Sequence, residues 1–266
     1  MHIITKTAVA LCLTIATTGS ALAGPPLATD DAGTVDAGSV EIELNSSYGY
    51  DRESADGVTT STNVVDGELK ITTGLYKNLG ISVAVPYTFS ARTSTDGAVS
   101  SIDGLGDMTF ELKYAFAELG GVNFAIKPQL VAPTGNYSRG FSEGHWHAGA
   151  LLIATKEFAD GSYALHANVG YEHHNYRTNA IRETTHGDLW SGSIAGEAEV
   201  SKGLFVVADF GLGTNPVKTS NELPVYALTG LRYEVNEHLD IDAGIKFGLT
   251  RPETDLTAVY GLVLKF

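Results

Sequence analysis

The sequence predicts an all-β protein: a transmembrane antiparallel β-barrel of about twelve strands, with the N- and C-termini in the periplasm. Three observations predict it. Apolar and polar residues alternate with a period of two through most of the chain. Short and long connections between these runs also alternate. Finally, the chain ends on the last residue of an alternating run, Phe266.

The first 23 residues are typical of a secretory signal peptide. Lys6 supplies the positive charge, residues 8–16 form a short apolar core, and Ala21-Leu22-Ala23 is a small-x-small cleavage site. A buried N-terminal helix is the alternative interpretation. We therefore expect residues 1–23 to be removed, residues 24–38 to form a periplasmic N-terminal segment, and residues 39–266 to form the barrel.

Strict alternation marks each predicted strand. Met108, Phe110 and Leu112, for example, alternate with polar residues such as Thr109 and Glu111, which gives one apolar and one polar face. The predicted strands span residues 39–50, 64–76, 81–90, 107–117, 122–131, 146–158, 162–173, 189–200, 204–214, 225–235, 239–249 and 256–266.

The connections and the aromatic residues indicate a membrane rather than a soluble barrel. Longer polar loops are expected near residues 51–63, 91–106, 132–145, 174–188, 215–224 and 250–255, with short turns between the other strand pairs. This is the layout of outer-membrane barrels. Aromatic residues gather at strand ends as two interfacial girdles. A secreted β-sandwich is the alternative.

With the apolar face in lipid, the polar face points into the lumen. The pore-lining candidates are the charged residues of that face: Glu41, Glu43, Glu68, Lys70, Glu111, Lys113, Lys127, Glu197, Glu199, Asp209, Arg232, Asp240, Asp242 and Lys246. Acids outnumber bases, and many other inward positions are Gly, Ala or Ser, so we favour a narrow acidic channel over a lumen filled by paired charges. Asp30 and Asp31 are candidates for partly occluding the periplasmic mouth.

Composition excludes several functions. The chain has 31 Asp and Glu against 17 Lys and Arg, a formal charge of −14, which argues against nucleic-acid binding. Its one cysteine lies in the predicted signal peptide, so no cysteine-based metal or iron–sulfur cluster is expected. We predict no cofactor. The expected partners are outer-membrane lipid and lipopolysaccharide, the barrel-assembly machinery acting through Phe266, and a small solute.

We find no catalytic residues in the sequence. A lipid-facing His and Ser two positions apart would indicate an outer-membrane phospholipase, but His166 is followed by Asn168 at that spacing. Histidines also cluster near the predicted loops, at positions 145, 147, 173, 174 and 186. One interpretation of these histidines is an external metal site. We favour polar loop residues instead and predict no metal.

Several short motifs carry a resemblance to a known family. They are residues 26–35 followed by an acidic strand, Gly104-Leu105-Gly106-Asp107, Pro133-Thr134-Gly135, and the C-terminal hairpin. Together they resemble a family of outer-membrane proteins named for the meta-pathway of phenol degradation. The resemblance covers the predicted mature chain and implies an outer-membrane transporter or channel connected with aromatic compounds. It implies no catalytic residues.

These observations leave three hypotheses for function. The first is passive passage of small neutral or hydrophobic solutes, aromatic ones among them, through the barrel. The second is a structural or sensory barrel with a plugged lumen that acts through its external loops. The third, which we favour least, is a lipid-modifying enzyme.

Overall fold

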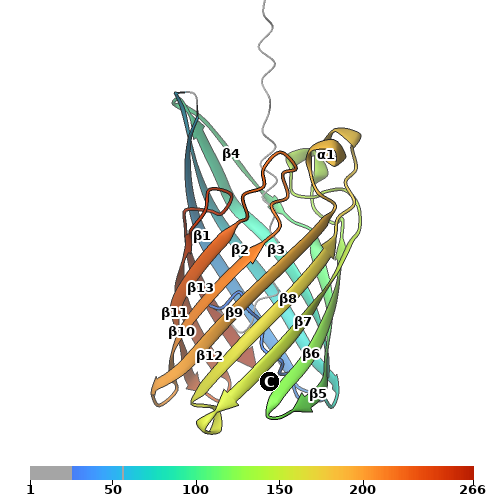
Figure 1. Ribbon diagram of the computed structural model, residues 1–266, viewed down its shortest axis with the longest axis vertical. Coiled ribbons are helices and arrows are strands. Elements are labelled where there is room, and N and C mark those ends of the chain that lie inside the picture. The colour runs from blue at the N-terminus through green and yellow to red at the C-terminus, as the bar shows by residue number, and fades with distance from the viewer. Residues whose placement is uncertain (1–25, 56) are drawn as a thin grey trace, which may run out of the picture.

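The protein is a closed antiparallel β-barrel, described here by a computed structural model that covers residues 26–55 and 57–266 (Figure 1). The predicted signal peptide lies outside these described residues. The strands are β1 (Val40–Ala55), β2 (Val58–Tyr76), β3 (Leu79–Thr95), β4 (Ala98–Leu105), β5 (Met108–Leu119), β6 (Val122–Ala132), β7 (His147–Phe158), β8 (Tyr163–His173), β9 (Asp188–Ser201), β10 (Leu204–Gly213), β11 (Val225–Asn236), β12 (Leu239–Gly248) and β13 (Leu256–Lys265).

The barrel closes through its first and last strands. β1 pairs with β13, where Glu41 lies opposite Lys265, and every other strand pairs with its neighbours in chain order. β4 and β5 both pair with β3, so they form one strand interrupted at Gly106 and Asp107. The ring therefore has twelve strands, as predicted. Among the described strands, each has at least two hydrogen-bonded neighbours except β4, which pairs with β3 alone. Such closure is what a bilayer requires.

The outer face of the barrel is apolar and the inner face is polar. Leu44 and Ile194, on the outer face, are 49% and 61% exposed, whereas the inward Lys127 is 2% exposed. Aromatic side chains pack on the outside as well, for example Tyr171 against Trp190 with ring centroids 4.6 Å apart. This is the inverse of a soluble barrel and matches lipid as the surrounding solvent. No helix among the described residues is long and apolar enough to cross a membrane.

The two ends of the barrel differ. At one end, called here the turn end, short connections join the strands and the C-terminus lies nearby (Figure 1). The other, called the loop end, carries the long connections. Two of these hold the short helices η1 (Tyr137–Arg139) and α1 (Asn179–Thr184), while η2 (Ala159–Gly161) lies in a turn.

Two predicted loops are strands instead. Residues 51–63 and 91–106 extend the β1–β2 and β3–β4 hairpins beyond the loop end of the neighbouring strands. Their Ser- and Thr-rich sequences pair across strands, as in the 3.1 Å contact between the Thr60 and Thr95 hydroxyls. Asp96 and Gly97 have φ angles of 47° and 85°, the left-handed pair that a tight hairpin turn needs. The prediction of loops was wrong because these strands are polar on both faces.

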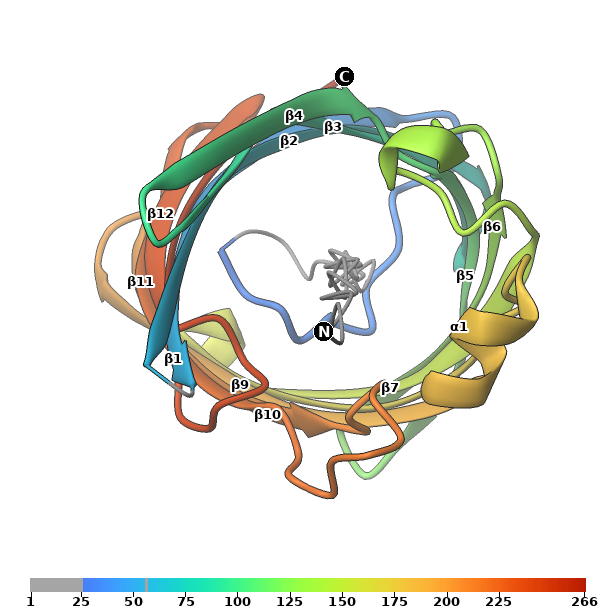
Figure 2. The ribbon, with the colours of Figure 1, turned by 90° about the horizontal axis from the view of Figure 1, so that it is seen from above.

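Residues 26–38, called here the luminal segment, fold back into the barrel rather than away from it. Figure 2 shows this segment in blue, inside the ring of strands. It enters at the turn end, where the Gly38 amide donates to the Gly74 carbonyl at 2.9 Å and Ala37 forms a parallel bridge with Gly74. The luminal segment therefore occupies part of the lumen.

Candidate functional site

Asp209 holds the far end of the luminal segment. This inward residue of β10 accepts hydrogen bonds from the backbone amides of Ala28 and Thr29, at 2.8 and 2.7 Å. The Thr29 hydroxyl donates to the same carboxylate at 2.7 Å, and the Tyr226 hydroxyl donates to it at 3.2 Å. Asp209 is 4% exposed. One buried carboxylate thus fixes the backbone of the segment, and charged acceptors make the stronger class of hydrogen bond.

The middle of the luminal segment is held by charge. Asp30 forms ion pairs with Lys113, at 2.9 Å, and with Lys127 on the neighbouring strand. Lys127 also lies 3.5 Å from Glu111, so each buried cation has a carboxylate partner. The Ala32 amide donates to the Thr155 hydroxyl at 2.8 Å. Buried charges need such partners, since an unpaired one costs several kcal/mol.

The segment reaches further into the barrel than the sequence suggested. We expected residues 24–38 to sit at one mouth, with Asp30 and Asp31 as the occluding residues. The described part instead continues to Leu27, which packs on Val207 and Leu228 of the barrel wall. Asp30 is buried at 3% exposure, whereas the side chain of Asp31 is 41% exposed. The segment lies along the lumen because Asp209, Lys113 and Lys127 offer partners there.

Most other inward charges are also paired across strands. Lys70 lies 3.3 Å from Glu43 and 3.7 Å from Glu111. Arg232 lies 3.1 Å from Glu197, and Lys265 lies 2.7 Å from Asp240. Such pairing is what the filled-lumen alternative requires.

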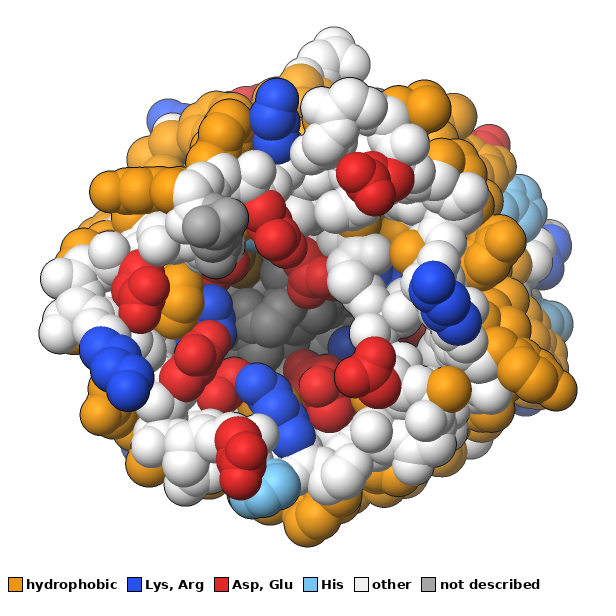
Figure 3. Space-filling view, turned by 90° about the horizontal axis from the view of Figure 1, so that it is seen from below, with side chains coloured by type: hydrophobic (Ala, Val, Ile, Leu, Met, Phe, Trp, Pro, Cys, Tyr) orange, Lys and Arg blue, Asp and Glu red, His pale blue; other side chains and the backbone are white. Residues whose placement is uncertain are grey.

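A cavity of about 990 Å³ remains between the luminal segment and the wall, at the turn end. Its lining includes eleven Asp or Glu side chains and six Lys or Arg side chains, so it carries an excess of negative charge. Figure 3 shows acidic and basic side chains surrounding the hollow at this end. Ten of the pore-lining candidates lie here: Glu41, Glu43, Lys70, Glu111, Lys113, Lys127, Glu197, Arg232, Asp240 and Asp242. Glu43, Asp240 and Asp242 each have one buried carboxylate oxygen without a hydrogen-bond partner among the described residues.

The other four candidates lie away from the cavity. Asp209 binds the luminal segment, as described above. Glu199 accepts the Gly203 amide at 2.8 Å in the β9–β10 turn. Lys246 pairs with Glu253 at 2.7 Å near the loop end, and Glu68 lies on β2 one inward position beyond Lys70 toward the loop end. The fourteen candidates thus lie at different heights of the barrel, and ten of them line the cavity.

The sequence interpretation missed three residues of the site. Thr29 of the luminal segment donates to Asp209, and Thr155 of the wall accepts the Ala32 amide of the segment. His166 lies in the cavity wall, with Nδ1 3.0 Å from the Thr155 hydroxyl. The alternation of β7 and β8 could have placed Thr155 and His166 inward. His166 and Asn168 thus face the lumen rather than lipid, and both are buried. This orientation weighs against a lipid-modifying site at these positions.

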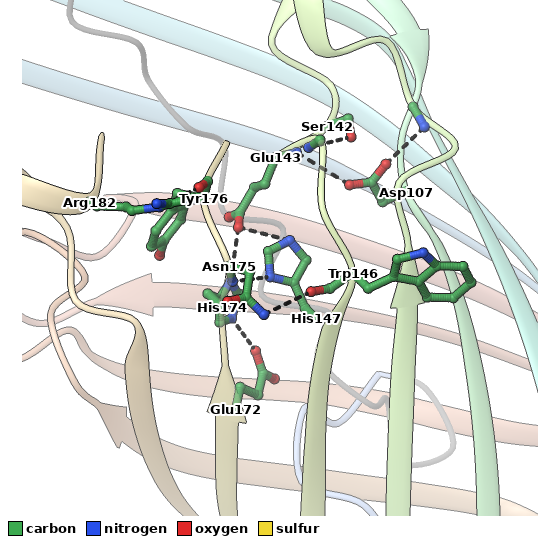
Figure 4. Close-up of polar contacts among 12 residues, drawn as sticks. Asp107, Ser142, Glu143, Trp146, His147, Glu172, His174, Asn175, Tyr176 and Arg182 are labelled. Carbon is green, nitrogen blue, oxygen red and sulfur yellow. Dashed lines mark hydrogen bonds and ion pairs between the residues drawn. The ribbon is translucent and has the colours of Figure 1, made fainter. Parts of the chain in front are cut away.

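A second polar cluster lies at the loop end (Figure 4). Glu143 Oε2 is 2.9 Å from His147 Nε2 and 3.2 Å from His174 Nδ1, and His174 Nε2 is 2.8 Å from Glu172 Oε2. Burial raises the pKa of Glu143, but the two imidazoles outweigh it and lower this pKa from 4.5 to about 2. Burial lowers the pKa of His174, but hydrogen bonds to Glu143 and Glu172 raise it to about 9. Burial and both carboxylates raise the pKa of Tyr176.

The family described as "Putative MetA-pathway of phenol degradation" matches residues 29–266, nearly all of the described chain. The chain belongs to this family. This confirms the resemblance drawn from residues 26–35 and the glycine motifs. Among curated proteins, none matches the sequence.

Several solved structures have a similar fold. The chain is similar to an outer membrane channel from Pseudomonas putida F1, with 15% identity, a TM-score of 0.69, and coverage of 89% of this chain and 98% of that one. It is also similar to the NanC porin (10% identity, TM-score 0.55, coverage 85% and 98%). A third similar structure is the translocator domain of the autotransporter NalP from Neisseria meningitidis (9%, 0.53, 87% and 90%). At such identities the likeness establishes an outer-membrane barrel fold, in agreement with the apolar outer face.

Proposed function

We propose that this protein is an outer-membrane channel for passive diffusion of small solutes, closed at rest by the luminal segment. The observation that carries the proposal is the charged cavity of about 990 Å³ inside a closed barrel with an apolar outer face. Among the described residues, hydrogen bonds, ion pairs and the apolar contacts of Leu27 and Ala32 hold the luminal segment in place, without a covalent link to the wall. A segment held in this way can leave the lumen without unfolding the barrel.

The proposal includes an orientation and a charge preference. The turn end and the C-terminus lie in the periplasm, the luminal segment begins inside the barrel, and the loop end faces outward, as in barrels with short periplasmic turns. Eleven acidic against six basic side chains around the cavity repel anions. Neutral molecules and small cations are therefore the solutes that pass.

The proposal also names a class of solute, namely uncharged aromatic compounds. The description of the family supports them, and an uncharged phenol meets no electrostatic barrier in an acidic lumen. Phenol added to one side of a bilayer should interrupt the single-channel current as it enters the lumen. Benzoate, which has a similar ring and a negative charge, should have little effect. Equal effects of the two compounds would contradict this part.

Planar-bilayer recording tests the channel itself. The purified protein should give small or brief currents, and a variant lacking residues 26–36 should give larger and longer ones, because the contacts of Asp209, Thr155 and Lys113 are gone. In a potassium chloride gradient the reversal potential should show preference for the cation. Heat-dependent mobility on a denaturing gel verifies that both barrels are folded.

The structural or sensory barrel is the second candidate, favoured by the paired charges of the lumen. Lys70, Lys127 and Arg232 each contact two or more carboxylates, which is the pattern of a filled interior. Folded barrels that pass no current with or without residues 26–36, and that admit no neutral sugar in liposome swelling, would support it against the channel.

A further inference from the structure

The loop-end cluster combines residues from three separate parts of the chain. Glu143 belongs to the connection between β6 and β7, His147 is the first residue of β7, and His174 directly follows β8. The β7–β8 register places Ala148 opposite His173, so His147 and His174 come next to each other at the strand ends. Their ring centroids are 4.6 Å apart. Figure 4 shows both imidazoles directed toward Glu143.

The donor atoms are arranged for a shared ion. One carboxylate oxygen and two imidazole nitrogens lie within 4.8 Å of one another. The side chains of His147, His174 and Glu143 are 6%, 13% and 21% exposed, so the cluster is largely shielded from water. Two histidines and one carboxylate are a common ligand set for zinc, with a further position left for water.

His147 provides an independent indication of a missing ligand. Its Nε2 atom is buried and makes no hydrogen bond of normal geometry, although Glu143 Oε2 is only 2.9 Å away. When two atoms bind the same ion, they lie close to each other without a hydrogen bond between them. The cluster thus contains a nine-tenths buried nitrogen that points at the space between Glu143 and His174.

Glu172 supplies the outer support that metal-bound histidines normally have. Its carboxylate lies 2.8 Å from His174 Nε2, which leaves His174 Nδ1 for an ion. Such a carboxylate fixes the ring and makes it a better ligand. The loop that carries Glu143 is also anchored, since Asp107 accepts the Gly135 amide at 2.8 Å.

His147 has to change its hydrogen bonding when an ion binds. The Asn175 amide donates to His147 Nδ1 at 3.2 Å, so Nε2 carries the ring proton in the metal-free protein. Coordination through Nε2 moves that proton to Nδ1 and breaks the bond to Asn175. His174 Nδ1, 3.2 Å from Glu143 Oε2, also has to be free of a proton, so ion binding rearranges the hydrogen bonding of both histidines.

We propose that Glu143, His147 and His174 form a binding site for a divalent transition-metal ion such as Zn²⁺, with Glu172 as a positioning residue. The sulfur-free set of nitrogen and oxygen donors suits Zn²⁺, Ni²⁺ and Cu²⁺ rather than Ca²⁺ or Mg²⁺. The ion ties the connection before β7 to the end of β8, and so fixes part of the loop end.

Calorimetric titration of the detergent-purified, tag-free protein with Zn²⁺ tests the site. We expect saturable binding of one ion, weakened at least 10-fold by Glu143→Gln, His147→Ala or His174→Ala. Glu172→Gln should weaken binding by about 10-fold, the range known for outer-shell partners. His145→Ala and His186→Ala are matched controls, because both histidines are exposed and lie outside the cluster.

A spectroscopic measurement separates this site from surface binding. X-ray absorption of the Zn²⁺-loaded protein should show nitrogen and oxygen ligands with two imidazoles, and this signature should disappear in His174→Ala. Gel mobility and circular dichroism establish that each variant is folded. No saturable binding, or equal loss in the His145→Ala control, would overturn the proposal and leave the cluster as an ion-pair network only.

Discussion

At the scale of single residues, Asp209 shows how a barrel wall can hold a chain segment without a covalent bond. Its two carboxylate oxygens accept two backbone amides and two hydroxyls, all from groups that would otherwise need water in the lumen. A carboxylate is suited to this task because it only accepts hydrogen bonds. Its replacement by an amide puts a donor against the amides of the segment.

Asp209→Asn should therefore open the channel. The substitution removes the charge and part of the accepting capacity facing Ala28 and Thr29. A loss of about 2 kcal/mol from these bonds corresponds to about a 30-fold shift toward the open state. Single-channel open probability measures it. Asp103→Asn serves as a control, since Asp103 is exposed at the loop end and contacts Arg139 rather than the segment. Unchanged opening in Asp209→Asn would contradict the role of this contact.

Lys127 is the residue whose loss should destabilise the barrel most. It is 2% exposed and lies between Asp30 and Glu111. Lys127→Met leaves these two carboxylates facing each other, and loss of one partner of a buried pair costs about 3–5 kcal/mol. Urea unfolding in lipid vesicles measures the change. Adding Asp30→Asn to Lys127→Met should restore part of the lost stability. No recovery in the double variant would show that the pairs are energetically unimportant.

The residue scale also shows the limit of sequence interpretation. Alternation placed Glu111, Lys113 and Lys127 on the inner face, because the direction of a side chain depends only on strand parity. The pairing of Lys113 and Lys127 with Asp30 was not predictable, since it depends on where a segment without periodicity folds back. The histidines of the loop-end cluster stood out in the sequence, but their contact with each other and with Glu143 was not predictable for the same reason. His147 and His174 are 27 positions apart in sequence, and only the β7–β8 register brings them together.

At the scale of elements, the twelve strands were predicted to within a few residues, except at the two extended hairpins. The transmembrane parts are predictable because lipid outside and water inside impose strict alternation. The extensions at residues 51–63 and 91–106 meet water on both faces, so the alternation disappears there. The Asp96-Gly97 pair remains as the local signal for the second hairpin turn.

At Gly74 the backbone of the luminal segment lies very close to the barrel wall. A substitution there tests whether the segment depends on this close approach. A β-carbon at Gly74 would collide with the backbone carbonyls of Val35 and Asp36. Gly74→Ala should displace the start of the segment and raise the mean conductance while the barrel stays folded. Gly192→Ala is the matched control, because a β-carbon there meets only an atom at 3.9 Å. Equal conductance in the two variants would show that the segment does not depend on this approach.

At the scale of the whole molecule, the net charge of −14 is unevenly distributed. The outer face in contact with lipid is apolar, and the cavity at the turn end has an excess of acidic side chains. Charges inside a narrow, poorly solvated space influence passing ions more strongly than charges on an open surface. The excess of acidic residues argued against nucleic acid as a partner. It is also the physical reason for the cation preference that we propose.

Neutralising part of this excess should change selectivity without opening or closing the channel. Asp31, Glu41 and Asp242 line the cavity, and none of them anchors the far end of the luminal segment as Asp209 does. In a barrel lacking residues 26–36, Glu41→Gln with Asp242→Asn should shift the reversal potential in a salt gradient toward zero, because two negative charges leave the path. The shift should shrink at high salt, where screening acts over about 3 Å at 1 M. Glu237→Gln, at an exposed turn residue outside the cavity, should leave the reversal potential unchanged. An unchanged potential in the double variant would mean that ions pass elsewhere than along these carboxylates.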